Sequence, residues 1–327
     1  MLQKSDLTVV ISSFNRDDKV AETLRRLFKC ELSRFVAVEV IVIDDGSPRA
    51  VRNVIERLGP PPDKMQLRLI EQPNAGIGAT RNRGFREAAS DMILFLDDDI
   101  LVKPTTLSEF AEAHRTHPGG VIFGSYPFVS HETESLKKFA EDLYGYDRIT
   151  NVPKYEKVNA ITSGLLCVDR SKLDNKEKFY RDDLRIPAAE EHEIIYRFDK
   201  LGIPIIHAQH IWATHNHHLE LEWIASQQFK YGEATAEAFE KIPDLIEMER
   251  FAQLKDGLEK LNAWEIKAIG KRMLASALGR KMLMGVCRTV SKFAPNSDHR
   301  KVFGYLTTAY FWAGFLRGGS ERTRANA

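Results

Sequence analysis

The first 125 residues alternate between two hydrophobic periodicities, and this alternation restricts the possible folds more than any other feature of the chain. Four short runs are apolar or β-branched and have the length of strands, namely Leu7–Ser13, Val38–Ile43, Leu67–Glu71 and Met92–Leu96. Residues with helical spacing lie between them, such as Val20, Leu24, Leu27 and Phe28, and then Val51, Val54, Ile55 and Leu58. Strands that alternate with such helices form βαβ units around a buried parallel sheet. The sequence therefore predicts an α/β protein with a doubly wound, mainly parallel sheet.

Hydroxyl and carboxylate side chains follow three of these predicted strands. The first strand ends in Ser12-Ser13-Phe14-Asn15-Arg16, the second in Asp44-Asp45-Gly46-Ser47 and the fourth in Asp97-Asp98-Asp99. Ligands of open parallel sheets bind outside the carboxyl ends of the strands. We therefore expect these side chains to line one binding crevice.

The acidic run Asp97-Asp98-Asp99 is the sharpest chemical signal in the chain. Adjacent carboxylates repel one another unless a cation neutralises them. Asp97 and Asp99, as alternate residues leaving a strand, are suited to share Mg²⁺ or Mn²⁺, whose remaining ligands are phosphate oxygens and water. The alternative interpretation is a solvated acidic turn. Because the run directly follows a buried strand, we favour the metal site.

Two further motifs have both a structural and a functional interpretation. Asp44 and Asp45 suit hydrogen bonds from a nucleobase or a ribose, but they equally suit the capping of a strand-to-helix turn. Residues 73–84 (PNAGIGATRNRG) lack the dinucleotide spacing and indicate a turn that opens a helix, with one of Arg81 and Arg83 facing the crevice. The chain has no GxxxxGK[ST] motif, which excludes a P-loop nucleotide hydrolase.

Two motifs in the second half of the chain add further candidates. Residues 190–193 (EEHE) open a predicted helix, where the carboxylates either favour the helix N-terminus or include a general base for an alcohol. Five of the ten histidines lie in residues 207–218 (HAQHIWATHNHH). Histidine-rich tracts suggest metal binding. We expect most of these histidines to be structural and one to complete the site begun by Asp97 and Asp99.

The order of these motifs resembles that of family 2 glycosyltransferases of the GT-A fold. The matching segments are SSFNR, VIDDGS, NAGIGATRNRG, LDDDI, TSGLLCV and EEHEIIYR, within about residues 7–220. The resemblance implies an inverting transfer of a sugar from a nucleoside diphosphate sugar to an acceptor hydroxyl, in the synthesis of a polysaccharide, a glycolipid or another glycoconjugate. It also implies Mn²⁺ or Mg²⁺ as the cofactor.

The resemblance also assigns roles to individual residues. It implies nucleotide binding by Ser13, Phe14, Asp44, Asp45, Arg81 and Asp98. It implies metal binding by Asp97, Asp99 and His215, with His217 as the alternative to His215. The catalytic base falls at Glu191, with Glu190 and Glu193 as alternatives.

The sequence departs from the family pattern at two positions. The usual Pro-Thr-Tyr after the first strand is Ser12-Ser13-Phe14, which removes a phenol and keeps an aromatic face for stacking. The base is usually the aspartate of a Glu-Asp pair, and this chain has Glu190-Glu191 there. Since glutamate is one methylene longer, the three glutamates stay open as candidates.

Two other functions compete with glycosyl transfer. A sugar nucleotidyltransferase has a similar sheet, but it needs a glycine-rich loop after the first strand, and SSFNRDD contains no glycine. A non-catalytic scaffold for glycan or lipid surfaces would not need intact acidic clusters. The sequence does not identify the donor base, the donor sugar or the acceptor. The acceptor would be recognised by the region between about residues 125 and 235.

The resemblance and the element pattern together predict the domain organisation. We expect a GT-A catalytic domain over residues 1–240, with a nucleotide-binding half (1–120) and an acceptor half (121–240). Further strands are predicted at 121–125, 159–168 and 204–208, and an acidic helix at about 190–201. A basic helical extension is predicted over 241–327.

The net charge of +1 over 327 residues conceals two opposite charges. Residues 255–327 contain 14 Lys+Arg and 5 Asp+Glu, a net charge of +9, so residues 1–254 carry −8. Basic helices with Met, Phe and Trp suit the surface of an anionic membrane. Packing on the catalytic domain or on a second copy is the alternative. The motifs give no support for a nucleic-acid partner.

The cysteines and the N-terminus predict the compartment. Cys30, Cys167 and Cys287 are odd in number, far apart and without a CxxC pair. They favour a reducing cytoplasm over a disulfide framework. The N-terminal apolar run lacks the features of a signal peptide, and no run of 18 apolar residues occurs. We therefore expect a cytoplasmic protein, either free or peripheral on the inner face of the membrane.

Overall fold

The computed structural model of the protein describes residues 6–48, 51–144, 154–252, 254–256, 272–295 and 297–325. The chain divides into two compact units. The first comprises Met1–Val129, Arg148–Arg185 and Arg197–His217, and the second comprises Ser130–Asp147, Ile186–Tyr196 and His218–Ala327. The expected domain limits at residues 120 and 240 stay a prediction.

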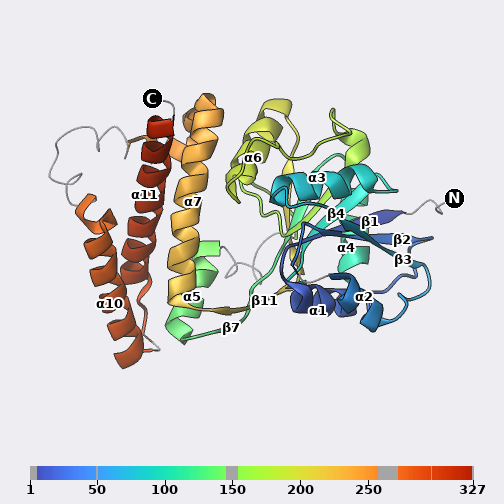
Figure 1. The fold of residues 1–327 in the computed structure, drawn as a ribbon, viewed down its shortest axis with the longest axis horizontal. Coiled ribbons are helices and arrows are strands. Elements are labelled where there is room, and N and C mark those ends of the chain that lie inside the picture. The colour runs from blue at the N-terminus through green and yellow to red at the C-terminus, as the bar shows by residue number, and fades with distance from the viewer. Residues whose placement is uncertain are drawn as a thin grey trace. The chain divides into compact units, whose positions relative to one another are not determined.

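An eight-stranded sheet forms the centre of the first unit (Figure 1). The strands follow the order β3-β2-β1-β4-β9-β6-β10-β8. Their bounds are β1 Leu7–Ser13, β2 Val38–Asp44, β3 Met65–Glu71, β4 Met92–Asp97, β6 Val121–Ser125, β8 Glu156–Lys157, β9 Leu165–Asp169 and β10 Ile205–Trp212. Neighbours among β1 to β4 are parallel, β10 is parallel to β6, and β9 is antiparallel to β4 and β6. The predicted mainly parallel α/β sheet is confirmed.

Helices cover both faces of this sheet (Figure 1). One face carries α1 (Asp17–Leu27), α2 (Val51–Leu58) and α4 (Thr106–Thr116), and the other carries α3 (Ile77–Glu87). The core under α1 contains Val20, Leu24 and Leu27, the residues at helical spacing, packed with alternate side chains of β1. Because both faces are covered, β1 and β2 are buried along their whole length.

A glycine brings α3 close to the sheet. A Cβ atom on Gly84 would lie 2.2 Å from Cγ1 of Val10 in β1. Any side chain at this position would therefore push the helix away from the strand. The close packing holds the preceding residues of α3, including Arg81, near the carboxyl end of the sheet.

The strand predicted over 159–168 forms only in its second half, as β9. In the antiparallel ladder, Leu165 is the partner of Leu96 at the carboxyl end of β4. Residues 159–164 come before that point and are not part of any strand. Gly164 instead accepts a hydrogen bond from the Asp97 backbone N–H at 3.0 Å, so this segment contacts the acidic run.

A small second sheet was not expected from the sequence. It contains β5 (Ile100–Leu101), β11 (Thr214–Leu219) and β7 (Phe128–His131), in the order β5-β11-β7. Its antiparallel register pairs His215 with Ile100, the residue after Asp99. Part of the histidine tract is thereby brought to the end of the acidic run.

The second unit is mainly helical. Its described helices include α5 (Glu134–Tyr144), α7 (Leu221–Lys241), α10 (Ala277–Phe293) and α11 (Arg300–Ala325). The first turns of α6 (Ala189–Leu201) and the short 3₁₀ helices Pro243–Glu247 and Glu249–Phe251 also belong to this unit. A third 3₁₀ helix, Arg170–Lys172, belongs to the first unit. The predicted helical C-terminal part is confirmed, while residues 257–271 of the expected extension lie outside the described residues.

Two further properties bear on the sequence predictions. In the part of the chain that the structure describes, every helix is too short or too polar to cross a lipid bilayer. Cys30, Cys167 and Cys287 are buried and free.

Candidate functional site

The side chains that follow β1, β2 and β4 come together within the first unit. The parallel register pairs Ser12 of β1 with Asp97 of β4, and Ser13 with Asp44 of β2. The ends of three neighbouring strands therefore meet at one edge of the sheet. This placement follows from the parallel order β2-β1-β4.

The acidic run is held by residues of the connection between β1 and α1. Ser13 Oγ donates a hydrogen bond to Asp98 Oδ2 at 2.8 Å. Arg16 Nη1 donates to Asp98 Oδ1 at 2.9 Å and to Asp99 Oδ2 at 3.0 Å. Both aspartates are buried, so the Arg16 guanidinium supplies the positive charge that neighbouring carboxylates require.

The two buried carboxyl groups differ in their proton affinity. Burial raises the pKa of Asp98 to about 6, even though the charge of Arg16 lowers it. Burial also raises the pKa of Asp99, but the hydrogen bond and charge of His215 and the charge of Arg16 outweigh burial and hold that pKa below its usual range. Asp99 is therefore the carboxylate better suited to stay ionised.

Asp97 points to a different cation. Arg81 Nη2 donates a hydrogen bond to Asp97 Oδ1 at 2.7 Å, and the Arg81 side chain is buried beside the Tyr180 ring. A Cβ atom on Gly164 would lie 2.8 Å from Asp97 Oδ2. The glycine of the TSGLLCV segment thus leaves space for this carboxylate.

The histidine tract supplies one partner to the acidic run. His215 Nε2 lies 3.4 Å from Asp99 Oδ2, and the rings of His215 and His217 are 5.7 Å apart between centroids. The tract's other members bond elsewhere: His207 with Ser125, His210 with the Lys154 carbonyl and His218 with Ser130. Because side chains alternate between the two faces of a strand, His215 and His217 lie on the same face of β11.

These residues have the donor types that a divalent cation needs. Asp99 offers carboxylate oxygens and His215 an imidazole nitrogen, which together suit Mn²⁺. Arg16 at the same carboxylate marks a place where positive charge is favourable. Among the described residues, no three His, Cys, Asp or Glu side chains are already grouped to hold a metal ion. The Asp99 carboxylate and the His215 imidazole therefore fit a divalent metal ion. The Asp97 carboxylate instead bonds Arg81.

Asp44 and Asp45 make the contacts expected of turn-capping residues. Asp44 Oδ1 accepts a hydrogen bond from the Ser47 N–H at 3.0 Å. Asp45 accepts hydrogen bonds from the backbone N–H groups of Ala75 at 2.9 Å and Gly76 at 3.0 Å. Asp45 therefore orders the loop that leads into α3. This ordering fixes the start of the helix that bears Arg81.

The end of β1 offers two groups to a ligand. Phe14 is 50% exposed, so its ring is accessible to a ligand from solvent. The Ser12 hydroxyl is buried, and it has no hydrogen-bond partner among the described residues. A buried hydroxyl without a partner is costly, which makes it a candidate to bond a ligand.

The three candidate bases lie in the second unit, in the first turns of α6. Glu190 and Glu193 are buried, whereas Glu191 is partly exposed. Arg250, in the same unit, is close enough to Glu191 for their charges to interact. The partial exposure of Glu191 distinguishes it from the two other glutamates.

Three contributors to the site were missed by the sequence reasoning. Arg16 stands in the SSFNR motif, but its pairing with Asp98 and Asp99 depends on the fold. Lys19 donates a hydrogen bond to the Asn216 carbonyl, and the Asn216 N–H donates to the Asp99 carbonyl at 2.8 Å. The motif that contains Arg16 was the available signal. Nothing in the sequence links Lys19 to Asn216.

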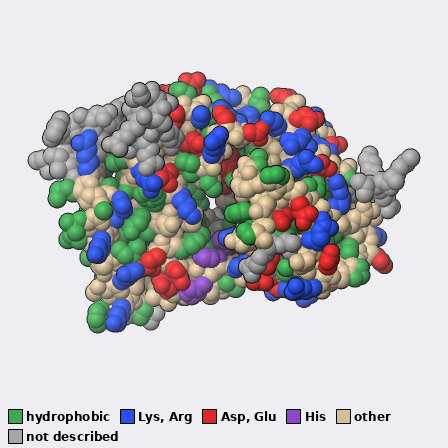
Figure 2. Space-filling model, viewed as in Figure 1, with side chains coloured by type: hydrophobic (Ala, Val, Ile, Leu, Met, Phe, Trp, Pro, Cys, Tyr) green, Lys and Arg blue, Asp and Glu red, His purple; other side chains and the backbone are tan. Residues whose placement is uncertain are grey.

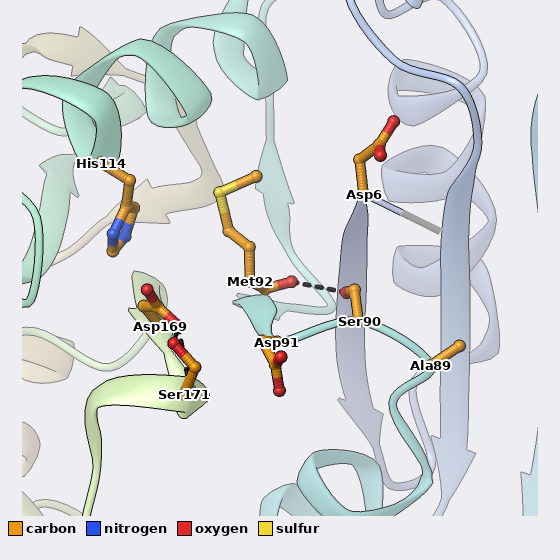
Figure 3. Close-up of a pocket in the computed structure, with 8 residues that line it drawn as sticks. All are labelled: Asp6, Ala89, Ser90, Asp91, Met92, His114, Asp169 and Ser171. Atoms are coloured by element: carbon orange, nitrogen blue, oxygen red, sulfur yellow. Dashed lines mark hydrogen bonds between the residues drawn. The ribbon is translucent and has the colours of Figure 1, made fainter. Parts of the chain in front are cut away.

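A cavity of about 340 Å³ lies at the other end of the same sheet (Figure 3). Its lining includes Asp6 before β1, Met92 at the start of β4 and His114 of α4. These positions are at the amino ends of β1 and β4, away from the acidic run. The sequence-predicted site residues are not part of its lining.

A mainly parallel sheet with buried carboxylates after its fourth strand is the architecture of GT-A glycosyltransferases. In agreement, the sequence profile described as Glycosyl transferase family 2 matches residues 8–198, more than half of the chain. The protein belongs to this family. The mannosyltransferase PcManGT from Pyrobaculum calidifontis, solved in complex with GDP-Man and Mn²⁺, aligns with a TM-score of 0.61 at 16% identity, over 95% of this chain and 87% of that chain. This likeness confirms the GT-A fold.

Two relatives are named for the sugar transfer that they catalyse. The validoxylamine A glucosyltransferase of Streptomyces hygroscopicus subsp. limoneus is 25% identical, over 65% of this chain and 52% of its own length. The GalNAc(5)-diNAcBac-PP-undecaprenol beta-1,3-glucosyltransferase of Campylobacter jejuni is 25% identical, over 54% of this chain and 57% of its own length. The chain spans about half the length of these relatives.

Proposed function

We propose that the protein is an inverting glycosyltransferase that moves a sugar from a nucleoside diphosphate sugar to an acceptor hydroxyl. The observation that carries this proposal is the buried Asp98-Asp99 pair beside His215, in a chain that belongs to family 2. Buried carboxylates at the carboxyl end of a parallel sheet are suited to a cation-bound anionic ligand.

We assign donor binding to the residues at the ends of β1, β2 and β4. The exposed ring of Phe14 offers stacking to a nucleobase. Ser13, Asp44, Asp45 and Asp98 offer polar contacts to the base and the ribose, and Arg81 offers its charge near the diphosphate. Asp44 and Asp45 keep their capping bonds in this role, because each carboxylate oxygen accepts more than one hydrogen bond.

The residues that would hold Mn²⁺ or Mg²⁺ are Asp97, Asp99 and His215, with His217 as the alternative to His215. When bound, such an ion stabilises the negative charge that develops on the leaving diphosphate. Arg16 would then have to share its carboxylate partners with the ion. Its 51% exposed side chain can turn toward solvent or toward the diphosphate.

The base assigned to the reaction is Glu191. The acceptor oxygen forms a bond to the anomeric carbon while the bond from that carbon to the diphosphate breaks, and the acceptor proton passes to the Glu191 carboxylate. A single displacement of this kind inverts the anomeric centre. The partial exposure of Glu191 supports this assignment over the buried Glu190 and Glu193.

We propose a glycan or a lipid-linked glycan as the acceptor. The support is the Campylobacter jejuni relative, whose name describes an undecaprenol-linked acceptor. A role in polysaccharide, glycolipid or other glycoconjugate synthesis follows from that acceptor class.

Nucleotide release tests the proposal directly. The protein is incubated with UDP-, GDP- and dTDP-sugars and Mn²⁺, and the released nucleoside diphosphate is measured. We expect slow donor hydrolysis with one donor class, and its loss in Asp99→Asn. Asp91→Asn, which changes an exposed carboxylate beyond the opposite end of β4, is the matched control.

Two outcomes would replace the proposal. Exchange of pyrophosphate into a sugar nucleotide would identify a nucleotidyltransferase. Neither hydrolysis nor exchange, together with no binding of any nucleotide, would indicate a non-catalytic scaffold.

A further inference from the structure

The outward face of α10 carries a row of large apolar side chains. Leu278, Met282, Val286 and Phe293 are 69%, 65%, 50% and 80% exposed. Their spacing of four, four and seven residues keeps them within one stripe along the helix. The inward face of the same helix buries Met284 and Cys287. Within the described part of the chain, the helix is therefore apolar on two sides, one buried in the second unit and the other exposed.

Basic side chains flank this exposed stripe. Lys281, Arg288 and Lys292 are exposed and lie along one edge of it, and residues 277–293 contain no acidic residue. Glu222 of α7 pairs with Arg288, while Lys281 and Lys292 extend from the helix surface. Figure 2 shows hydrophobic side chains among Lys and Arg side chains over this part of the molecule.

We propose that this outward face of α10 (the α10 face: Leu278, Lys281, Met282, Val286, Lys292 and Phe293) binds the surface of an anionic lipid bilayer. An amphipathic helix with a basic edge lies in the plane of the membrane interface, with its apolar stripe among the acyl chains and its lysines at the headgroups. The 17 residues of α10 and their charges are unsuited to crossing the bilayer.

The charge of the helix favours lipid over a second copy of the chain. A symmetric contact between two α10 faces would bring together two helices that carry basic residues and no carboxylates. Like charges at such a contact oppose association. Anionic headgroups offer the complementary charge to Lys281 and Lys292 on the basic edge.

Vesicle flotation of the full chain tests the proposal. The vesicles are phosphatidylcholine alone, or phosphatidylcholine with roughly one third phosphatidylglycerol, at low and at high salt. We expect the protein to float only with the anionic vesicles and to be released by high salt. Binding requires neither a donor sugar nor a metal, so its result is independent of the proposed catalytic function.

Two double variants separate the lysine and apolar contributions. Lys281→Glu with Lys292→Glu should weaken binding at least about twentyfold, because each lysine near an anionic surface adds about 1 kcal/mol, or about fivefold. Met282→Ser with Val286→Ser should weaken binding about tenfold or more through lost apolar burial. Lys29→Glu with Lys172→Glu changes the net charge equally at exposed positions of the first unit and should keep binding.

Circular dichroism and donor hydrolysis check that each variant is folded. The proposal is overturned if the chain fails to float with anionic vesicles, or if the control pair loses binding as strongly as the α10 pair. It is also overturned if the chain sediments as a dimer that Met282→Ser with Val286→Ser dissociates, without any vesicle binding. That result would assign the α10 face to a second copy.

Discussion

The acidic run depends on the small residue beside it. Gly164→Ala would place a Cβ atom 2.8 Å from Asp97 Oδ2 and 3.0 Å from the Tyr126 hydroxyl. The Asp97 carboxylate, whose other oxygen accepts the hydrogen bond from Arg81, must then shift. We expect donor hydrolysis to fall about tenfold or more, since a displacement of this size in a positioned group is costly. Released nucleotide measured at saturating donor gives the result.

Gly78→Ala is the matched control for this change. Its Cβ atom would meet its nearest neighbour, the Arg181 carbonyl oxygen, at an ordinary 3.5 Å. We expect this variant to retain full hydrolysis. Equal activity in Gly164→Ala and Gly78→Ala would contradict a role of Asp97 in the reaction.

Asp98 makes the stability of the first unit depend on pH. Burial raises its pKa to about 6 from an ordinary 3.8, so the folded protein binds this proton more tightly than the unfolded chain does. The resulting stabilisation is complete below pH 3.8 and is lost as the pH rises through about 6. Asp98→Asn does not titrate. The free energy of unfolding of Asp98→Asn, relative to that of the wild type, should therefore be about 2 kcal/mol higher at neutral pH than near pH 4.

Urea unfolding in the presence of a chelator measures this difference. Asp91→Asn, an exposed carboxylate of the same unit, serves as the control. Parallel pH profiles for the wild type and Asp98→Asn would show that the buried carboxyl group is not responsible.

At the residue scale, the sequence predicted where the polar groups gather but not how they pair. The strand ends identify Asp97, Asp98 and Asp99, because carboxyl ends of parallel strands meet at one edge. Which arginine neutralises which carboxylate depends on side-chain reach across the sheet. Arg16 pairs with Asp98 and Asp99, and Arg81 pairs with Asp97. The spacing of these residues in the sequence does not predict either pairing.

Among the elements, α7 and α11 pack through glycines within the second unit. A Cβ atom on Gly314 would lie 1.9 Å from the Phe229 carbonyl oxygen, which is backbone and cannot turn aside. Gly314→Ala must separate the two helices. We expect it to reduce the free energy of unfolding by about 1–3 kcal/mol, as overpacking does. Urea denaturation followed by circular dichroism measures this change.

Gly304→Ala, in the same helix, is the control because nothing lies within 4 Å of its Cβ position. It should raise stability by about 0.5–1 kcal/mol, since alanine is the better helix former. A comparable loss of stability in both variants would point to helix propensity rather than to packing against α7.

Elements with a strong hydrophobic period were predictable, whereas short polar strands were not. β1 and β2 are rich in β-branched apolar residues, and α1 repeats Val20, Leu24 and Leu27 at helical spacing. β11, with the sequence THNHHL, has no apolar alternation and depends on pairing with β5. The histidines of this segment suggested metal binding. In the strand, His215 and His217 lie on the same face because alternate side chains point the same way.

At the scale of the whole molecule, the charge asymmetry agrees with the two functions proposed for the two parts of the chain. Residues 1–254 carry a net charge of −8 and contain the acidic run, while residues 255–327 carry +9 and contain the α10 face. The near-zero net charge of the whole chain therefore says little about its binding partners. The sequence revealed this division by counting, but the exposure of the apolar stripe on α10 required the fold.

The proposed catalysis separates donor binding from proton transfer along the chain. The donor and metal candidates lie in the first unit, and Glu191 lies in the second. Glu191→Gln should keep donor affinity within about twofold of wild type and reduce transfer by about 10²–10⁴, because glutamine cannot accept the acceptor's proton. Asp99→Asn should lose donor binding in the presence of Mn²⁺. Calorimetric titration with donor and product formation with an acceptor glycan measure the two effects.

Glutamine variants of Glu190, Glu191 and Glu193 together identify the catalytic base. If Glu191→Gln transfers sugar at the wild-type rate, the base is not Glu191, and the same pair of measurements on Glu190→Gln and Glu193→Gln then identifies it. If all three variants retain transfer, no carboxylate of α6 is the base. Loss of donor affinity in Glu191→Gln would instead assign this side chain to the donor, because a base for the acceptor hydroxyl is not required to bind the nucleotide.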